Sequence, residues 1–331
     1  MTASLIVVVV VVAPVPFVAI SPGSVVGVDD LVQVAERPSD DVGGSFYLTT
    51  VKLAPVTPLE AVQGWLRPEV DVVGAGRFSP GHLTSAELRQ LNLDQMDASK
   101  QQALAVALEQ LGHDAVSGDG AEVVDVVSGA PADGVLDSGD LIVGVDGTSV
   151  TSHYDVLRLL AERRPHRDVR IDVETAGGEG RRTTALTLAP DGDDPEGARL
   201  GAMLRTRHPR FDLPVDVDIT TEHIGGPSAG LAFALAVLDA LTEGDLTGGR
   251  RVAATGTIGL DGSVGPVGGV SQKAVAADHH EIDLFLVPRP ELLQASRVAG
   301  EGVRVEPVDT LDDALRILTD GSASTLVPTS W

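Results

Sequence analysis

The sequence predicts an α+β protein of several domains, and three observations lead to this prediction. The chain has 331 residues, of which 43% are hydrophobic, enough to bury two or three cores. Segments that alternate like β-strands are interleaved with segments of helical periodicity. The local pattern changes near residue 113, and the acidic, Gly/Pro-containing stretch DGDDPEGA marks a second change. We therefore expect five segments, at residues 1–22, 23–112, 113–190, 191–198 and 199–331.

Composition excludes several classes of protein. The chain has 48 acidic and 24 basic residues, a formal net charge of -24. Such a surface repels phosphate backbones, so we expect no nucleic-acid partner and interpret the acidity as a solvated surface suited to solubility or high salt. Cysteine is absent, which excludes disulfides, thiol nucleophiles and zinc–thiolate sites and leaves the compartment open.

Residues 1–22 are predicted to be a membrane anchor or uncleaved signal segment. Leu5 to Ile20 is apolar apart from Pro14 and Pro16. The valine run at 7–12 is also strongly β-prone, so a buried strand is the alternative. Because the run opens the chain and a Pro/Gly segment follows, we favour the anchor. The residues before it supply no basic n-region, so we expect translation to begin upstream of Met1.

Residues 23–112 are predicted to be an α+β connecting module without an assigned function. FYLTTVKL (46–53) alternates like a strand, and TPLEAVQGWL (57–66) has a helical pattern. A longer helical pattern spans 85–112 and ends at Gly112. The module contains no cluster of residues that resembles a ligand site.

Residues 113–190 form a different pattern. They read as a strand, a short helix of small residues, a Gly-Asp turn, a strand, an Asp-Gly turn, a helix from His153 to about Arg163, and two closing strands. SGAPADG and LDSGDLIVGVDG, with the helix that follows, resemble the PDZ domains of bacterial proteases over about 75 residues. The resemblance implies a small β-sandwich or barrel.

A PDZ-type domain implies a bound peptide. Such domains add an extended peptide to a sheet and hold its terminal carboxylate in a nest of backbone N–H groups. The loop that would do so here is Ser117, Gly118, Asp119 and Gly120. It departs from the family's Gly-hydrophobic-Gly-hydrophobic pattern, and Asp119 would repel a carboxylate. We predict peptide binding, with a spacer or gate as the alternative.

The stretch GGPSAG (225–230) lies between an alternating segment, LPVDVDITTEHI, and a long apolar helical pattern, LAFALAVLDAL. Gly225, Gly226 and Gly230 permit backbone geometry that a Cβ would obstruct. Backbone N–H groups at such a helix start can stabilise a developing oxyanion. The turn therefore predicts that the hydroxyl of Ser228 is a nucleophile.

One interpretation of this turn is the nucleophile elbow of an α/β-hydrolase, because Gly226 to Gly230 satisfies G-x-S-x-G. The acid would then be Asp239 or Asp261, and the base His279 or His280. The surrounding sequence does not match an α/β-hydrolase fold, since only about 100 residues follow Ser228 and no HGGG-type strand precedes it. The two histidines are explained more simply as solvated turn residues.

Lysine is a better candidate for the base. The chain has 21 arginines but only three lysines, and Lys273 lies in an otherwise uncharged Gly/Val/Ala stretch. Arginine cannot give up its proton at ordinary pH, whereas lysine can. A catalytic lysine must be neutral, so its pKa must fall from about 10.4 to 7–8, at a cost of roughly 3 to 5 kcal/mol. The apolar neighbours of Lys273 permit the burial that produces such a shift.

GGPSAG and TGTIGLDGSVGPVGGVSQK together resemble the Ser-Lys proteolytic domain of the Lon protease family over about residues 199–320. The resemblance implies an α+β fold in which Ser228 is the nucleophile and Lys273 the general base. Thr255 would orient the lysine amine, and Gly226, Pro227 and Gly230 would shape the turn. Ser271 stands where the family often has a lysine, and Thr257 where it often has an acid.

As a whole, the chain resembles the membrane-anchored, PDZ-containing Lon-like proteases of bacteria. The resemblance implies a serine endopeptidase that cleaves unfolded or flexible polypeptides, with the PDZ domain for substrate binding or gating. No G-x-x-x-x-G-K-[ST] occurs, so we expect no ATP requirement, and we expect no cofactor or metal. By analogy we expect a homo-oligomer and a single-pass protein of the bacterial cell membrane, with both domains extracytoplasmic. A membrane-tethered peptide-binding scaffold with an inactive protease domain is the alternative.

Overall fold

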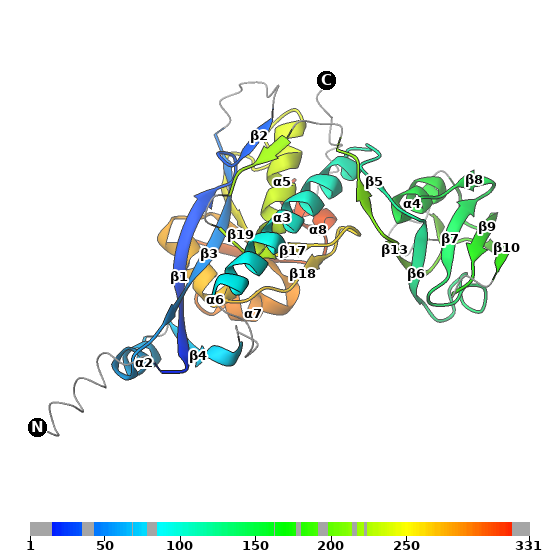
Figure 1. Cartoon of the computed structure of the whole chain (residues 1–331). Coiled ribbons are helices and arrows are strands. Elements are labelled where there is room, and N and C mark those ends of the chain that lie inside the picture. The colour runs from blue at the N-terminus through cyan, green and yellow to red at the C-terminus, as the bar shows by residue number, and fades with distance from the viewer. Residues whose placement is uncertain are drawn as a thin grey trace, which may run out of the picture. The chain divides into compact units, whose positions relative to one another are not determined.

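The computed structural model describes residues 15–34, 43–67, 69–77, 85–161, 163–176, 180–190, 198–213, 217–221 and 224–319. The chain divides into two compact units (Figure 1). Unit 1 comprises Met1–Ala107 and Val215–Trp331, and unit 2 comprises Leu108–Pro214. Unit 2 is therefore inserted, in sequence, between the two parts of unit 1. Of the predicted linker, only Ala198 lies within the described residues.

Unit 1 is built on a six-stranded sheet with the order β4-β1-β3-β16-β19-β20. β3 pairs in parallel with β16, with Phe46 opposite Val252, and so joins the two parts of the unit. The segment predicted as a connecting module, residues 23–112, thus supplies β3, β4 and the end of β1 to this sheet. The strands are β1 (Phe17–Gly27), β3 (Ser45–Pro55), β4 (Asp71–Gly74), β16 (Arg251–Ala254), β19 (Leu284–Pro288) and β20 (Arg304–Val308). Two short pairs accompany it, β2 (Val32–Val34) with β15 (Val217–Ile219) and β17 (Thr257–Ile258) with β18 (Val264–Gly265).

Both faces of the central strands are buried. Phe285 and Val287 of β19 pack in one cluster with Val270 and Ala274. The alternate residues of the strand are buried too, Leu286 among them, and successive side chains of a strand point to opposite faces. This burial explains why β16 and β19 are nearly continuous apolar runs. The helices of unit 1 are α2 (Pro58–Trp65), α3 (Ser85–Gln110), α5 (Gly230–Leu241), α6 (Val270–His279), α7 (Leu292–Ser296) and α8 (Leu311–Leu318), with 3-10 turns η1 (Ala75–Arg77), η2 (Pro227–Ala229) and η3 (Arg289–Glu291).

The structure corrects the predicted membrane localisation. Among the residues that are described, no helix is both long enough and apolar enough to span a membrane. Residues 17–22 of the predicted anchor belong to β1, which pairs antiparallel with β3 and β4. Ile20 of this strand is buried, so packing within unit 1 explains why the strand is apolar there. Residues 1–14 of the predicted anchor lie outside the described residues.

Unit 2 contains a sheet with the order β10-β9-β7-β6-β13, and β8 pairs with β7. Its core consists of inward-facing aliphatic residues such as Ile142, Ile171 and Val173, with Val156 of α4. β13 pairs antiparallel with β6 and forms one edge of the sheet. The elements are β5 (Val116–Ser117), β6 (Ala121–Val126), β7 (Leu141–Val145), β8 (Thr148–Ser149), α4 (His153–Ala161), β9 (Asp168–Glu174), β10 (Arg181–Thr187), β11 (Ala189–Pro190), β12 (Ala198–Arg199), β13 (Ala202–Thr206) and β14 (Arg210–Phe211).

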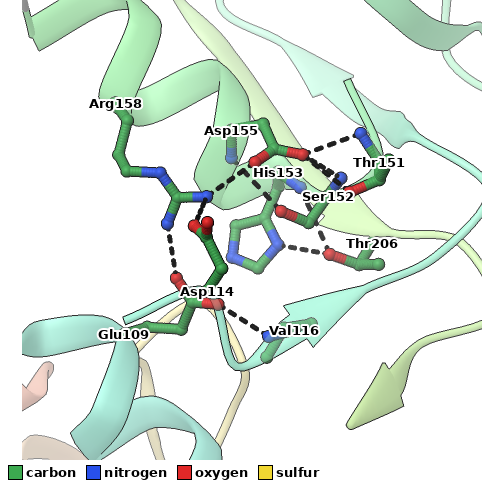
Figure 2. Close-up of polar contacts among 9 residues, drawn as sticks. All are labelled: Glu109, Asp114, Val116, Thr151, Ser152, His153, Asp155, Arg158 and Thr206. Carbon is green, nitrogen blue, oxygen red and sulfur yellow. Dashed lines mark hydrogen bonds and ion pairs between the residues drawn. The ribbon is translucent and has the colours of Figure 1, made fainter. Parts of the chain in front are cut away.

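A polar cluster fixes helix α4 within unit 2 (Figure 2). Arg158 contacts the carboxylates of Glu109, Asp114 and Asp155 at 2.6–2.8 Å. The Glu109 side chain is fully buried, and its other oxygen accepts the backbone N–H of Val116 at 2.7 Å. Burial raises the pKa of Glu109 above its ordinary value. The guanidinium of Arg158 therefore compensates a buried carboxylate as well as joining α4 to the start of the unit.

Candidate active site

Ser228 lies on a sharp turn that leads into helix α5. Gly226 has φ 91° and ψ 157°, in a region that residues with a Cβ rarely adopt. Pro227, Ser228 and Ala229 form the 3-10 turn η2, and α5 begins at Gly230. A Cβ on Gly230 would lie 2.9 Å from the backbone nitrogen of Ile258. The glycines therefore permit both the turn and the close approach of β17, and the Ser228 side chain is left partly exposed.

Lys273 and Thr255 meet Ser228 from two other elements. Thr255 follows the carboxyl end of β16 and is fully buried, and Lys273, in the first turns of α6, is 2% exposed. The Nζ atom of Lys273 lies 2.8 Å from Ser228 Oγ and 2.8 Å from Thr255 Oγ1. Two hydroxyl groups predicted from sequence motifs, those of Ser228 and Thr255, are thus within hydrogen-bonding distance of the Lys273 amine.

Burial lowers the pKa of Lys273 from 10.5 to about 7, and the carboxylate of Glu291 opposes this shift. The cause is loss of solvation, because the ammonium form has little water around it in this apolar site. The flanking Val270 and Ala274 are themselves buried. A substantial fraction of this lysine is therefore neutral near pH 7, as a general base requires.

The backbone of the turn is held by groups on both sides. Thr255 Oγ1 donates a hydrogen bond to the carbonyl of Ser228 at 3.2 Å, and the N–H of Gly256 donates to the same oxygen at 3.0 Å. Two contacts come from α3, where the Asn92 carbonyl accepts the N–H of Gly226 at 2.9 Å and Ser99 Oγ donates to the Pro227 carbonyl at 3.2 Å. Neither Asn92 nor Ser99 belongs to a sequence motif that predicts a site residue.

Three residues of the alternative hydrolase interpretation, His280, Asp261 and Asp239, form hydrogen bonds with residues close to them in sequence. His280 Nδ1 donates to the carbonyl of Ala276 at 2.8 Å. Asp261 accepts the hydroxyl of Ser263 at 2.6 Å, and Asp239 accepts the backbone N–H of Leu246 at 2.8 Å. These contacts do not connect a histidine to Ser228.

The loop predicted to bind a peptide carboxylate, residues 117–120, forms hydrogen bonds and ion pairs with another segment of unit 2. Ser117 belongs to β5 and pairs with Arg210. The carboxylate of Asp119 contacts Arg210 at 3.2 Å and His208 at 2.8 Å, and its backbone N–H donates to the carbonyl of Arg207. The carbonyl of Gly118 accepts a further bond from Arg210 at 2.9 Å, and that of Gly120 accepts the Arg207 N–H. The polar groups of the loop are thus hydrogen-bonded to residues 207–210 of the same unit.

Comparison with known families defines the class of these domains. Residues 205–320 match the model for the Lon protease (S16) C-terminal proteolytic domain, and residues 98–185 match the model for the PDZ domain. The chain therefore contains a Lon-type proteolytic domain and a PDZ domain, as the motifs predicted, and this combination supports a serine peptidase. From residue 215 onward the proteolytic match lies in unit 1, and this part contains Ser228, Thr255 and Lys273.

Particular relatives can then be named. The chain is 39% identical over 94 residues to the Lon protease of Lachnoclostridium phytofermentans, which covers 28% of this chain and 11% of that protein. It is 29% identical over 162 residues to Lon protease 1 of Hydrogenovibrio crunogenus, covering 45% of this chain and 20% of that protein. The chain thus spans only a minor part of the length of these relatives. A solved PDZ domain of an SdrC-like protein from Listeria monocytogenes covers 26% of this chain and 87% of its own, with 25% identity and a TM-score of 0.24.

Proposed function

We propose that this chain is an ATP-independent serine endopeptidase that cleaves unfolded or flexible polypeptides with Ser228 as nucleophile and Lys273 as general base. The observation that carries the proposal is the 2.8 Å separation between Ser228 Oγ and the amine of a lysine that is 2% exposed. Desolvation lowers the pKa of this lysine to about 7, and a purely structural lysine would gain nothing from that loss of solvation.

Thr255 determines whether the Lys273 amine donates a hydrogen bond to the Ser228 hydroxyl or accepts one from it. Its single hydroxyl proton is donated to the carbonyl of Ser228, so its oxygen is left to accept an N–H from Lys273. With one N–H used in this way, the lone pair of the neutral amine can face Ser228 Oγ. Thr255 therefore supports a geometry in which the serine hydroxyl donates its proton to the lysine.

The reaction is acyl transfer to the serine. Ser228 Oγ attacks the carbonyl carbon of a peptide bond while its proton passes to Lys273 Nζ, and the backbone N–H groups of the turn stabilise the oxyanion. Lys273 then gives the proton to the departing amine as the peptide C–N bond breaks. In the second half, Lys273 takes a proton from a water molecule as the water oxygen attacks the ester carbonyl. The ester C–O bond then breaks, the acid is released, and Lys273 returns the proton to Ser228 Oγ.

The PDZ domain would supply peptide binding. β13 is an edge strand of its sheet and lies beside α4, which exposes Leu157 to solvent. A free strand edge next to a helix with an exposed apolar side chain can accept an extended peptide by strand addition. This edge suits the role better than the loop at residues 117–120, whose polar groups already bond to residues 207–210. A flexible substrate bound in this way would be kept near the proteolytic domain, and assembly into a homo-oligomer would keep several sites together.

The pH dependence of cleavage tests the proposal. The full chain is incubated with unfolded casein without ATP at pH 5–9, products are identified by mass spectrometry, and identically purified Ser228→Ala protein controls for contaminating proteases. Because only the neutral amine is a base and its pKa is about 7, kcat/KM should rise with pH through 7 and be about 100-fold lower at pH 5 than on the plateau. Equal cleavage by the Ser228→Ala protein, or no cleavage at any pH, would contradict the proposal and leave a peptide-binding scaffold as the alternative.

A further inference from the structure

Ser99 is a buried hydroxyl on a helix outside the segment that matches the proteolytic domain. It lies in the middle of α3 and is 3% exposed. Met96, Ala103 and Ala107 are buried on the same helix, at spacings that place them on one face with Ser99. A serine in this apolar stripe needs a partner for its hydroxyl. A serine within a helix can bond the preceding turn of that helix, but Ser99 donates instead to the carbonyl of Pro227, at 3.2 Å.

This carbonyl belongs to the peptide group that carries the N–H of Ser228. A peptide group is planar, and in its trans form the C=O and N–H bonds point in opposite directions; no cis peptide occurs in the described part of the chain. A donor that holds the Pro227 carbonyl therefore sets the direction of the Ser228 N–H on the other side of the peptide plane. Ser99 and the N–H of Gly230 both donate to this carbonyl.

The two residues that precede Ser228 in the turn offer no free backbone N–H that could act as the oxyanion donor. The N–H of Gly226 is used by the carbonyl of Asn92, and Pro227 has no N–H. The N–H of Ser228 is thus the first donor of the turn that could face a substrate bound at Ser228 Oγ. The next peptide group, which carries the N–H of Ala229, is held in the same way, because its carbonyl accepts from Gly256 and Thr255.

We propose that Ser99 is a positioning residue that orients the N–H of Ser228 toward the oxyanion of the acylation step. The role rests on the proposed function, because it requires Ser228 to be the nucleophile. Ser99 does not touch the substrate and acts through the Pro227 carbonyl. That carbonyl keeps its bond from Gly230 when the hydroxyl is removed, so Ser99→Ala leaves no unpaired buried acceptor and little stability should be lost.

The test compares Ser99→Ala with Gln101→Ala, an exposed neighbour on the same helix. Both variants and the wild type are assayed on a peptide taken from a mapped casein cleavage site, and binding of the corresponding peptide boronate, whose serine adduct is a tetrahedral anion, is measured. Removing an oxyanion donor outright costs about 10²–10³ in kcat, so misdirecting one should lower kcat about 10- to 100-fold. KM and the midpoint of the pH profile should stay unchanged, and boronate affinity should fall by a similar factor.

Thermal unfolding followed by circular dichroism accompanies the assay, and rates are normalised to folded protein. A Ser99→Ala protein whose normalised kcat and boronate affinity stay within threefold of those of Gln101→Ala would overturn the role of Ser99 while leaving the protease intact. A Ser99→Ala protein whose KM rises while its kcat falls, or whose pH midpoint moves, would also overturn the role of Ser99. An effect confined to the oxyanion changes neither KM nor the pH midpoint. A wild-type protein that neither cleaves nor binds the boronate would overturn the proposed function, and this role with it.

Discussion

Lys273→Met is expected to abolish peptide hydrolysis and, at the same time, to stabilise the fold at neutral pH. Methionine has nearly the length of lysine and fills the same buried space, but it cannot accept the proton of Ser228. We expect kcat/KM to fall by at least about 10³-fold. Lys273→Arg should be equally inactive, since a guanidinium does not give up its proton. Lys100→Met, which changes a lysine that pairs with Asp97 on α3, is the matched control and should retain activity.

The gain in stability follows from linkage. The pKa of Lys273 is about 7 in the folded protein and about 10.4 in the unfolded chain, so the unfolded chain binds more protons between these values. The destabilisation by Lys273 is therefore greatest below pH 7 and disappears above about pH 10.4. Allowing for the lost contacts with Ser228 and Thr255, we expect Lys273→Met to raise the free energy of unfolding by about 2–4 kcal/mol at pH 7.

Urea unfolding at pH 7 and pH 10 measures this difference, provided that the transition of unit 1 is resolved. The advantage of Lys273→Met over the wild type should shrink as the pH rises, because the wild type recovers its stability. A variant that is less stable than the wild type at pH 7 would contradict the low pKa, and a variant that keeps normal kcat/KM would remove Lys273 from the mechanism.

Arg158→Ala is expected to destabilise unit 2 by about 2–4 kcal/mol. The substitution leaves the fully buried carboxylate of Glu109 without its cation, whereas its bond to the N–H of Val116 remains. Removing one partner of a buried pair typically costs about 3–5 kcal/mol, and we lower the figure because Arg158 is itself 37% exposed. Thermal unfolding should show a lower transition for unit 2.

Arg181→Ala is the matched control for this prediction. Its ion pair with Glu174 lies on the same unit, but the two side chains are 65% and 40% exposed, and such a pair contributes about 0–1 kcal/mol. If Arg158→Ala unfolds at the same temperature as Arg181→Ala, the buried negative charge of Glu109 must be removed in another way, such as protonation of the carboxyl group. Burial already raises the pKa of this group. A double variant with Glu109→Gln should then recover little.

Local patterns in the sequence were sufficient to predict most secondary structure. The helix predicted for 57–66 is α2, and the longer one predicted for 85–112 is α3. Helix α2 begins with a threonine capping box, a signal carried by residues within one turn. The strand predicted for 46–53 is β3. Such signals involve neighbours in sequence, and this explains why the pattern reveals them.

The apolar N-terminus shows where a local pattern was ambiguous. The anchor was predicted from the apolar composition of residues 1–22 and from their position at the start of the chain. The valine run at 7–12 lies outside the described residues, and no described helix could span a membrane. In the structure, Phe17–Gly27 is a strand because β3 and β4 supply hydrogen-bond partners on both sides. Those partners lie in segments that periodicity alone does not link to residues 17–27.

The sequence by itself determined the two kinds of domain, the turn at GGPSAG and the choice of Ser228, Lys273 and Thr255 as candidate site residues, since each depends on a short motif with unusual residue types. Only the tertiary structure showed that β3 pairs with β16, that burial lowers the pKa of Lys273, and that Ser99 on α3 donates to the carbonyl of Pro227. The physical reason is the same in each case. Strand pairing, desolvation and hydrogen bonding across a turn depend on groups that are distant in sequence and meet only when the core forms.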